Sequence, residues 1–219
     1  MKIGIIGGTG DIGKGLALRL SDKYQIIIGS RDEKKAIETA EHIVQTLQKI
    51  NIKSTCKGST NEDAVKDSDI IVISVMFPYV SQTLSTINPK YFENKIIISP
   101  VNPIEKRNGY FYYNPPKEGS AALAIQKMLP KSVKLVTAFN NIAANKWTLI
   151  NEDLEYTVAV CGDDLQTKKE VMSLVSKISK LHAVDAGPLD ISGIIESITP
   201  LVLNIAKNNN LKDVWVYYK

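Results

Sequence analysis

The chain has 219 residues, enough for one substantial domain, or one domain with a small annex, around a buried core. It is 44% apolar and 23% charged with a net charge of +4, as is ordinary for a globular protein, and its basic residues are not interleaved with aromatic ones as in nucleic-acid binders. Two isolated cysteines, Cys56 and Cys161, argue against a disulfide framework or a zinc site and fit a reducing compartment.

The chain opens on an apolar run that stops at Gly7 and is followed by Asp11, Lys14 and Arg19. A secretory signal needs a longer apolar core and a cleavage site, so we do not expect this run to be a leader. No later stretch approaches the roughly 18 uninterrupted apolar residues of a membrane span. We therefore expect a cytoplasmic protein without a membrane partner.

Short apolar runs rich in Ile and Val predict strands at 2–7, 24–29, 69–75, 95–99, 134–139 and 156–162. Most lack polar alternation, which is typical of parallel strands covered on both faces. The stretches between and after them predict helices at 13–22, 32–50, 119–129, 165–181 and 189–208. This alternation predicts an α/β fold, with a Rossmann-type, doubly wound, mostly parallel sheet in 1–150 and a small C-terminal α/β part in 151–219.

Two segments are candidates for a lid or hairpin and for an interface with a second copy of the chain. The longest irregular segment, 100–119, fits either a lid or a hairpin in which "GYFYYN" forms a strand. The last helix has apolar residues around much of its circumference, namely Ile194, Ile195, Ile198, Leu201, Val202 and Ile205. Such a wide apolar surface predicts a homodimer interface, and filling the core of the C-terminal part is the alternative.

Gly8, Gly10 and Gly13 form a GxGxxG pattern directly after the first predicted strand and before the first predicted helix. In this setting the first glycine permits a tight turn, the second lets the backbone approach a pyrophosphate, and the third lets the helix pack closely on the strand. The backbone amides around Asp11 and Ile12 would face the phosphates, with help from the helix dipole. We expect a bound dinucleotide here rather than a glycine-rich turn without a ligand.

The end of the second strand distinguishes NADP from NAD. Ser30 and Arg31 occupy this position, and Lys34 and Lys35 lie in the first turn of the next helix. A hydroxyl, a guanidinium and an ammonium suit the 2′-phosphate of NADP. Asp32 would instead suit the ribose hydroxyl of NAD if the register were shifted by one residue, although it is also a plausible helix cap. The pattern favours NADP(H).

The chain has few candidates for acid–base catalysis. Its histidines are His42, expected on a solvent-exposed helix face, and His182, expected to be partly buried and structural. No Ser-His-Asp set, metal-ligand cluster or general-acid lysine stands out. Hydride transfer between two redox cofactors needs none of these, because the cofactor rings carry the hydride while the protein binds, orients and excludes water. The inventory suits such an enzyme and equally a non-catalytic NADP(H)-binding regulatory protein.

Two sets of motifs, one near each end of the chain, carry a resemblance to a known family. The first set is "GGTGDIGKGLALRL" and "GSRDEKK". The second is "VCGDD", "KKEVMSLVSKI", "VDAGPL" and "ESITPLVLNIA", which a nucleotide-binding domain has no generic reason to contain. Over essentially the whole chain they resemble the archaeal coenzyme F420-dependent NADP reductases. These belong to a wider group of Rossmann reductases that includes the ferric reductase domains of Steap proteins.

The resemblance implies which residues contact the cofactors. NADP(H) would lie across the glycine turn, with Thr9, Gly10, Asp11 and Ile12 at the pyrophosphate. The 2′-phosphate would contact Ser30, Arg31 and Lys35. The nicotinamide side would be flanked by Met76, Phe77, Asn102 and the segment from Asn140 to Ala144. Val214 and Trp215 are candidates for the wall that closes over the second cofactor.

The resemblance also implies hydride transfer between NADP(H) and the deazaflavin coenzyme F420, stacked face to face, in a homodimer. Two departures from the family pattern lie on the side of the second substrate. The chain has "MFPY" at 76–79 where relatives commonly read Pro-Trp-Glu-His, and Asn140 where many have a histidine. They leave open another acceptor, such as free flavin, a ferric chelate or an imine.

Overall fold

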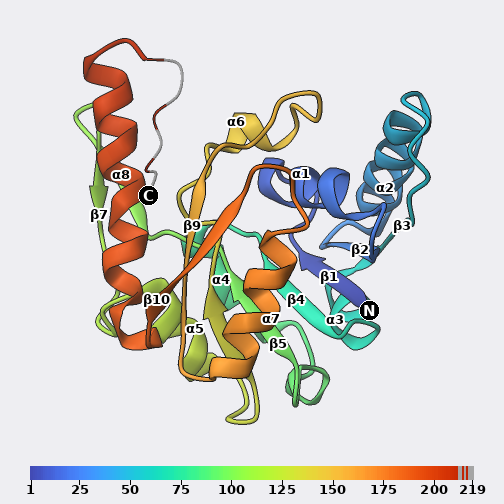
Figure 1. The fold of residues 1–219 in the computed structure, drawn as a ribbon. Helices are drawn as coiled ribbons and strands as arrows, with labels where there is room; N and C mark the ends of the chain where they lie inside the picture. The colour runs from blue at the N-terminus through green and yellow to red at the C-terminus, as the bar shows by residue number, and fades with distance from the viewer. Residues whose placement is uncertain (212–213, 215, 217–219) are drawn as a thin grey trace.

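The computed structural model describes residues 1–211, 214 and 216, and an eight-stranded sheet forms its centre (Figure 1). The strands lie in the order β10-β9-β8-β5-β4-β1-β2-β3. Their bounds are β1 Lys2–Ile6, β2 Gln25–Ser30, β3 Cys56–Thr60, β4 Ile70–Ile73, β5 Ile96–Ser99, β8 Lys134–Thr137, β9 Thr157–Gly162 and β10 His182–Gly187. From β3 to β8 neighbouring strands are parallel, whereas β9 is antiparallel to β8 and β10 parallel to β9. The parallel part has the strand order of a Rossmann sheet, which confirms the predicted fold class.

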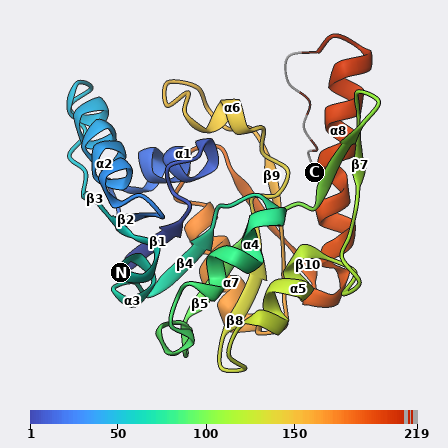
Figure 2. The same ribbon diagram turned by 180° about the vertical axis from the view of Figure 1, so that it is seen from behind.

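Helices cover both faces of the sheet, as the two opposite views show (Figures 1 and 2). One face packs against α1 Asp11–Leu20, α2 Glu33–Gln48 and α7 Leu165–Val175. The other packs against α3 Asn61–Lys66, α4 Phe77–Ser85 and α5 Ala121–Met128. The short α6 Ala144–Trp147 lies over α1, and α8 Ser192–Asn208 stands at the far side of the molecule.

Two apolar cores explain why the central strands contain almost no polar residues. Ile5 and Ile28 face the core under α1 and α2, whereas Ile6 and Ile71 face the core under α4 and α5. All four side chains have no exposed surface. Because successive residues of a strand point to opposite faces and both faces are covered, an uninterrupted apolar run is the stable solution.

The segment 100–119 contains a two-stranded hairpin, β6 Ile104–Arg107 and β7 Tyr110–Tyr113. Asn108 and Gly109 connect the strands with φ angles of 49° and 80°. Asn-Gly with two positive φ angles is the favoured sequence for a two-residue hairpin turn. Of the two interpretations left open by the sequence, the hairpin is confirmed, and it lies beside α8 (Figure 1).

Helix α8 is bound to the rest of the chain by polar side chains. Asn204 accepts from the N–H of Phe111 at 2.9 Å and donates to its carbonyl at 2.7 Å. By length and composition alone, residues Leu189–Asn208 could span a membrane, whereas no such stretch was expected from the sequence. In the fold this stretch carries Glu196, which is fully buried and bonded to α5. These contacts make α8 a packed element of the domain.

The C-terminal strands extend the same sheet. Val136 of β8 pairs with Gly162 of β9, so the sheet is continuous across the boundary placed at residue 150, and the division into two parts stays a prediction. His182 is exposed at the start of β10, so its expected burial was wrong, and His42 is exposed on α2 as expected. Trp215 lies outside the described residues.

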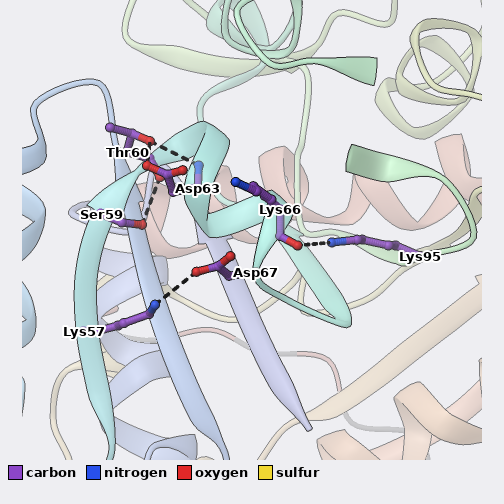
Figure 3. Close-up of polar contacts among 7 residues, drawn as sticks. All are labelled: Lys57, Ser59, Thr60, Asp63, Lys66, Asp67 and Lys95. Atoms are coloured by element: carbon purple, nitrogen blue, oxygen red, sulfur yellow. Dashed lines mark hydrogen bonds and ion pairs between the residues drawn. The ribbon is translucent and has the colours of Figure 1, made fainter. Parts of the chain in front are cut away.

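The short helix α3 is fixed by polar contacts at both ends (Figure 3). Thr60 caps its first turn by accepting from the N–H of Asp63 at 3.1 Å. Lys57 of β3 forms an ion pair with Asp67 at 3.2 Å, and Lys95 Nζ donates to a carbonyl of the last turn at 3.0 Å. The helix thereby presents its first residue, Asn61, to the turn that follows β1.

Candidate active site

A cleft of about 940 Å³ opens at the carboxyl ends of the parallel strands. Four walls come from the segments that follow β1, β4, β5 and β8. The fifth comes from α8, with Thr199, Val202, Leu203 and Ala206, and from Val214. The cleft therefore includes the point between β1 and β4 at which the strand order reverses, which is where ligands bind in open α/β sheets.

The turn after β1 is held by neighbouring elements. Gly7 has a φ of +69°, which glycine adopts without steric cost, and its N–H donates to Asn61 Oδ1 at 3.1 Å. The N–H of Gly8 donates to the carbonyl of Gly29, at the end of β2, at 2.9 Å. The left-handed residue is thus Gly7, one position before the glycine to which the motif assigns the tight turn. Gly8 is required for space, because a Cβ there would lie 2.9 Å from the Ile5 carbonyl oxygen.

Gly13 and Gly10 differ in what surrounds them. A Cβ on Gly13 would lie 2.5 Å from the Cα of Gly8, so this glycine allows α1 to pack against the turn, as predicted. A Cβ on Gly10 would meet no described protein atom closer than the Gly7 carbonyl oxygen at 3.6 Å. The protein's own packing does not demand glycine at position 10. The space in front of its backbone fits the approach of a pyrophosphate.

Helix α1 begins at this open space. Its N-cap is Gly10, which supplies no side-chain hydrogen bond, and the first N–H groups of a helix have no acceptor within the helix. Gly10, Asp11 and Ile12 line the cleft, with Gly8 and Thr9 preceding them in the same turn. Unsatisfied N–H groups and the helix dipole make this corner favourable for an anion.

The end of β2 lies beside the turn, since the Gly29 carbonyl holds the N–H of Gly8. Ser30 is buried, and Arg31 and Lys35 are exposed. Asp32 Oδ1 accepts from the N–H of Lys35 at 3.1 Å, so Asp32 caps α2. The capping interpretation of this carboxylate is confirmed. The three residues expected at a 2′-phosphate lie outside the cleft lining, with Ser30 buried and Arg31 and Lys35 at the surface.

The cleft lining also contains the residues expected near the nicotinamide. Met76 and Phe77 follow β4, Asn102 follows β5, and Ala144 opens α6, and all four line the cleft. Met76 has 69% of its surface exposed, so much of this wall is apolar and accessible. The structure brings these residues together with the glycine turn in one cavity.

A network of hydrogen bonds around Asn102 joins three parts of the cleft wall. Asn102 Nδ2 donates to the carbonyl of Asn140 at 2.8 Å and to Thr199 Oγ1 at 2.9 Å. Thr199 in turn donates to the same carbonyl at 2.6 Å. The segments after β5 and β8 are thereby tied to α8, which fixes the three walls relative to one another.

Two observations bear on whether the cleft fits a bound dinucleotide. One is the open space in front of the Gly10 backbone. The other is Ser74, which directly follows β4 and lines the cleft, and whose buried Oγ has no hydrogen-bond partner in the part of the chain that the structure describes. A buried hydroxyl without a partner destabilises the protein, and a ligand that forms a hydrogen bond with it removes this cost. Both features therefore fit a polar ligand that extends from the glycine turn past β4.

Sequence reasoning missed three residues of this site, namely Asn61, Ser74 and Thr199. Asn61 reaches Gly7 across 54 positions of the chain, and Thr199 reaches Asn102 across 97. Neither belongs to a local motif. Ser74 lies inside a predicted strand, and no signal in that run distinguishes it.

Comparison with known proteins agrees with the geometry. A family model described as "NADP oxidoreductase coenzyme F420-dependent" matches residues 2–103. The F420-dependent NADP reductase of Methanocaldococcus jannaschii is 36% identical, over 94% of this chain and 92% of that protein. The enzyme of the same name from Methanothermobacter thermautotrophicus is 33% identical, over 99% and 94%. The crystal structure of a candidate F420-dependent NADP reductase from Arthrobacter sp. FB24 superposes over 100% of both chains with a TM-score of 0.80 at 21% identity, which supports the fold.

Proposed function

The chain belongs to the coenzyme F420-dependent NADP oxidoreductases, and on this basis we propose that its cleft holds NADP(H) and F420 together and lets a hydride pass between them. One observation carries the proposal. Among the described residues that line the cleft, the only ionisable side chain is Asp11, at the glycine turn. The rest are apolar residues, amides, hydroxyls and glycine. Such a lining binds and orients flat rings but offers no acid–base pair at their far end.

When bound, the two coenzymes exchange the hydride through their own rings. The protein has to align the two rings and exclude water from them. Met76 and Phe77 supply apolar surface on one side, and Val202 and Leu203 of α8 supply it on the other. The amide network around Asn102 ties α8 to the segments after β5 and β8.

We assign the glycine-turn end to NADP(H). Gly8, Thr9, Gly10, Asp11 and Ile12 would hold the pyrophosphate through backbone N–H groups. Ser30, Arg31 and Lys35 would hold the 2′-phosphate, and the capping role of Asp32 supports this choice because its carboxylate is engaged by α2. Met76, Phe77, Asn102 and Ala144 would flank the nicotinamide and the second substrate.

The test is to mix the protein with NADPH and oxidised F420 and follow the loss of deazaflavin absorbance. We expect reduction that depends on the protein and on NADPH. A rate no higher than that of the blank without protein would overturn the proposal. Reduction of free flavin, a ferric chelate or an imine with comparable efficiency would assign a different acceptor. Tight NADP(H) binding without turnover by any acceptor would identify a regulatory protein instead.

We also propose that the enzyme is a cytoplasmic homodimer. Ile194, Leu201 and Ile205 are spaced at seven and four residues, so they share one face of α8, and they are 68%, 58% and 38% exposed. Ile195 and Val202, about a quarter-turn farther round the helix, and Glu196, on the opposite face, are buried in the molecule. The buried face accounts for the packing of α8 within the chain, and a second copy would cover the exposed face.

A further inference from the structure

An amide oxygen without a partner lies in the wall of the cleft. Asn140 follows β8, is 3% exposed and lines the cavity. Its Oδ1 is buried and accepts no hydrogen bond from any of the described residues. Buried side-chain acceptors are almost always satisfied, so an unsatisfied one on a residue that lines a binding cleft indicates a ligand group that donates to it.

The orientation of this amide is set by its neighbours. Asn102 Nδ2 is directed at the Asn140 carbonyl, so Asn102 Oδ1 points to the Asn140 side chain. Asn140 Nδ2 donates to that oxygen at 3.1 Å and to the carbonyl of Val101 at 3.3 Å. Rotating the amide would place its oxygen against two other oxygens. The atom without a partner is therefore the amide oxygen, an acceptor, and a ligand that bonds to it must supply a donor.

The backbone immediately before Asn140 adopts a costly conformation. Phe139 has a φ of +69°, in the left-handed region that a bulky residue seldom occupies. Its ring is 1% exposed and packs edge-on against Trp147, with centroids 5.5 Å apart. Such strain persists where the surrounding packing imposes it, and it is concentrated at functional sites. Here the strained residue is Phe139, and the packing of its ring fixes the backbone that leads into Asn140.

The location of Asn140 favours the second substrate over NADP(H). The glycine turn follows β1, β4 is its neighbour in the sheet, and β8 is two strands farther along. The unpartnered Ser74 Oγ stands at β4, on the side of the glycine turn. Asn140 stands at the far end, where Thr199 of α8 joins the wall.

We propose that Asn140 Oδ1 accepts a hydrogen bond from the ring imide N–H of the deazaflavin and so positions the hydride acceptor. The inference rests on the proposed function. The carboxamide of NADP(H) carries an N–H of the same chemistry, and separate binding measurements distinguish the two sources. Asn140 acts here as a positioning residue, since an amide oxygen moves no proton.

The first test measures binding to Asn140→Ala, with oxidised F420 titrated by its fluorescence and NADP+ by calorimetry. We expect F420 to bind about tenfold more weakly and the NADP+ affinity to change less than about twofold, as for the loss of one hydrogen bond to one ligand. The matched control is Asn204→Ala, which removes a bonded amide from α8 outside the cleft lining. An unchanged F420 affinity, or an equal loss of NADP+ affinity, would overturn the proposal.

A second arm separates positioning from folding and does not depend on the variant. Wild-type protein should bind an F420 derivative methylated at the imide nitrogen about tenfold more weakly than F420 itself. Asn140→Ala should bind the two more nearly equally. Thr199→Val removes the bond to the Asn140 carbonyl but keeps Oδ1, and it should still discriminate between them. Equal discrimination by wild type and Asn140→Ala would overturn the proposal, whereas wild type that fails to reduce F420 would overturn the proposed function itself.

Discussion

Arg31 is the residue that decides between the two nicotinamide dinucleotides. It follows β2 and lies next to the glycine turn, with its guanidinium exposed. A bond between a guanidinium and a phosphate is charge-assisted and exists only with NADP(H). Arg31→Ala should raise the Kd for NADPH by about 10-fold to 100-fold and that for NADH by less than about twofold.

Titration of wild type and variant with each dinucleotide gives the four constants. Lys49→Ala, which removes one positive charge from the other end of α2, controls for the overall charge. Equal weakening of NADPH and NADH by Arg31→Ala would mean that Arg31 does not touch a 2′-phosphate.

Individual residues were predictable where neighbours in the chain act together. The glycines and the segment from Ser30 to Lys35 form local motifs, and their spacing follows from a strand that turns directly into a helix. Asn140 Oδ1 shows the limit, because its lack of a partner depends on where Asn102 points. Nothing in a linear pattern records such an arrangement.

In the turn that leads into α1, one glycine is required by the packing of the protein and another by the ligand. Gly13→Ala would place a Cβ 2.5 Å from the Cα of Gly8, and no side chain can move to relieve that contact. We expect its Tm to fall by about 5 °C or more. Gly10→Ala, with its nearest neighbour 3.6 Å away, should keep most of its stability and lose about tenfold or more in NADP+ affinity.

Thermal unfolding and calorimetric titration of both variants test this pair. Each variant controls for the other, because both add a single methyl group to the same turn. A Gly10→Ala protein that binds NADP+ as tightly as wild type would place the pyrophosphate elsewhere.

Glu196 joins three elements. Its carboxylate accepts from the N–H groups of Ala121 and Ala122, at the start of α5, at 2.7 and 3.0 Å. It also accepts from the hydroxyl of Tyr113, on β7, at 3.3 Å. Burial raises the pKa of this carboxyl to about 7, although the three hydrogen bonds act in the opposite direction. Burial is the main cause of the raised pKa of Tyr113, and the Glu196 carboxylate raises it further.

A raised pKa makes the stability depend on pH in a defined direction. The folded state retains a proton that the unfolded carboxyl releases, so the stabilisation is complete below about pH 4.5 and is lost as the pH rises through about 7. The change in the free energy of unfolding over this window is on the order of 3 kcal/mol. Urea unfolding at pH 5 and pH 7.5 should show this slope in wild type and its loss in Glu196→Gln. The exposed Glu155→Gln is the control, and the same slope in all three proteins would refute the assignment.

Elements were predictable in proportion to how completely they are buried. The Ile-rich strands lie between two helix layers, which leaves a clear apolar run in the sequence. The edge strand β3, "CKGST", is only partly covered and carries polar residues, so its sequence resembles a loop. Strand β10 lies at the other edge, and four of its six residues are half-buried. Such strands depend on pairing with β2 and β9, which no local pattern reveals.

The exposed face of α8 bears on the assembly of the whole molecule. A charge at its centre should prevent a second copy from packing there, because a buried unpaired charge is costly. We expect Leu201→Glu to shift the protein from dimer to monomer in sedimentation velocity runs. Ile37→Glu, at an exposed apolar site on α2, should leave the dimer intact. A wild-type protein that sediments as a monomer would remove the basis for this interface.

The two ends of the chain meet in the complete fold. The glycine turn follows the first strand and the closing wall belongs to the last helix, so the cleft that both line exists only when the sheet is complete. In this cleft we expect a hydride to pass directly from one coenzyme to the other.

The most direct measurement uses NADPH carrying two deuterium atoms at C4 of the nicotinamide. The enzyme reduces F420 with it in ordinary water, and the product is analysed by mass spectrometry and NMR. Direct transfer predicts one deuterium on the ring carbon of the reduced deazaflavin. Product without deuterium at that carbon would contradict direct transfer.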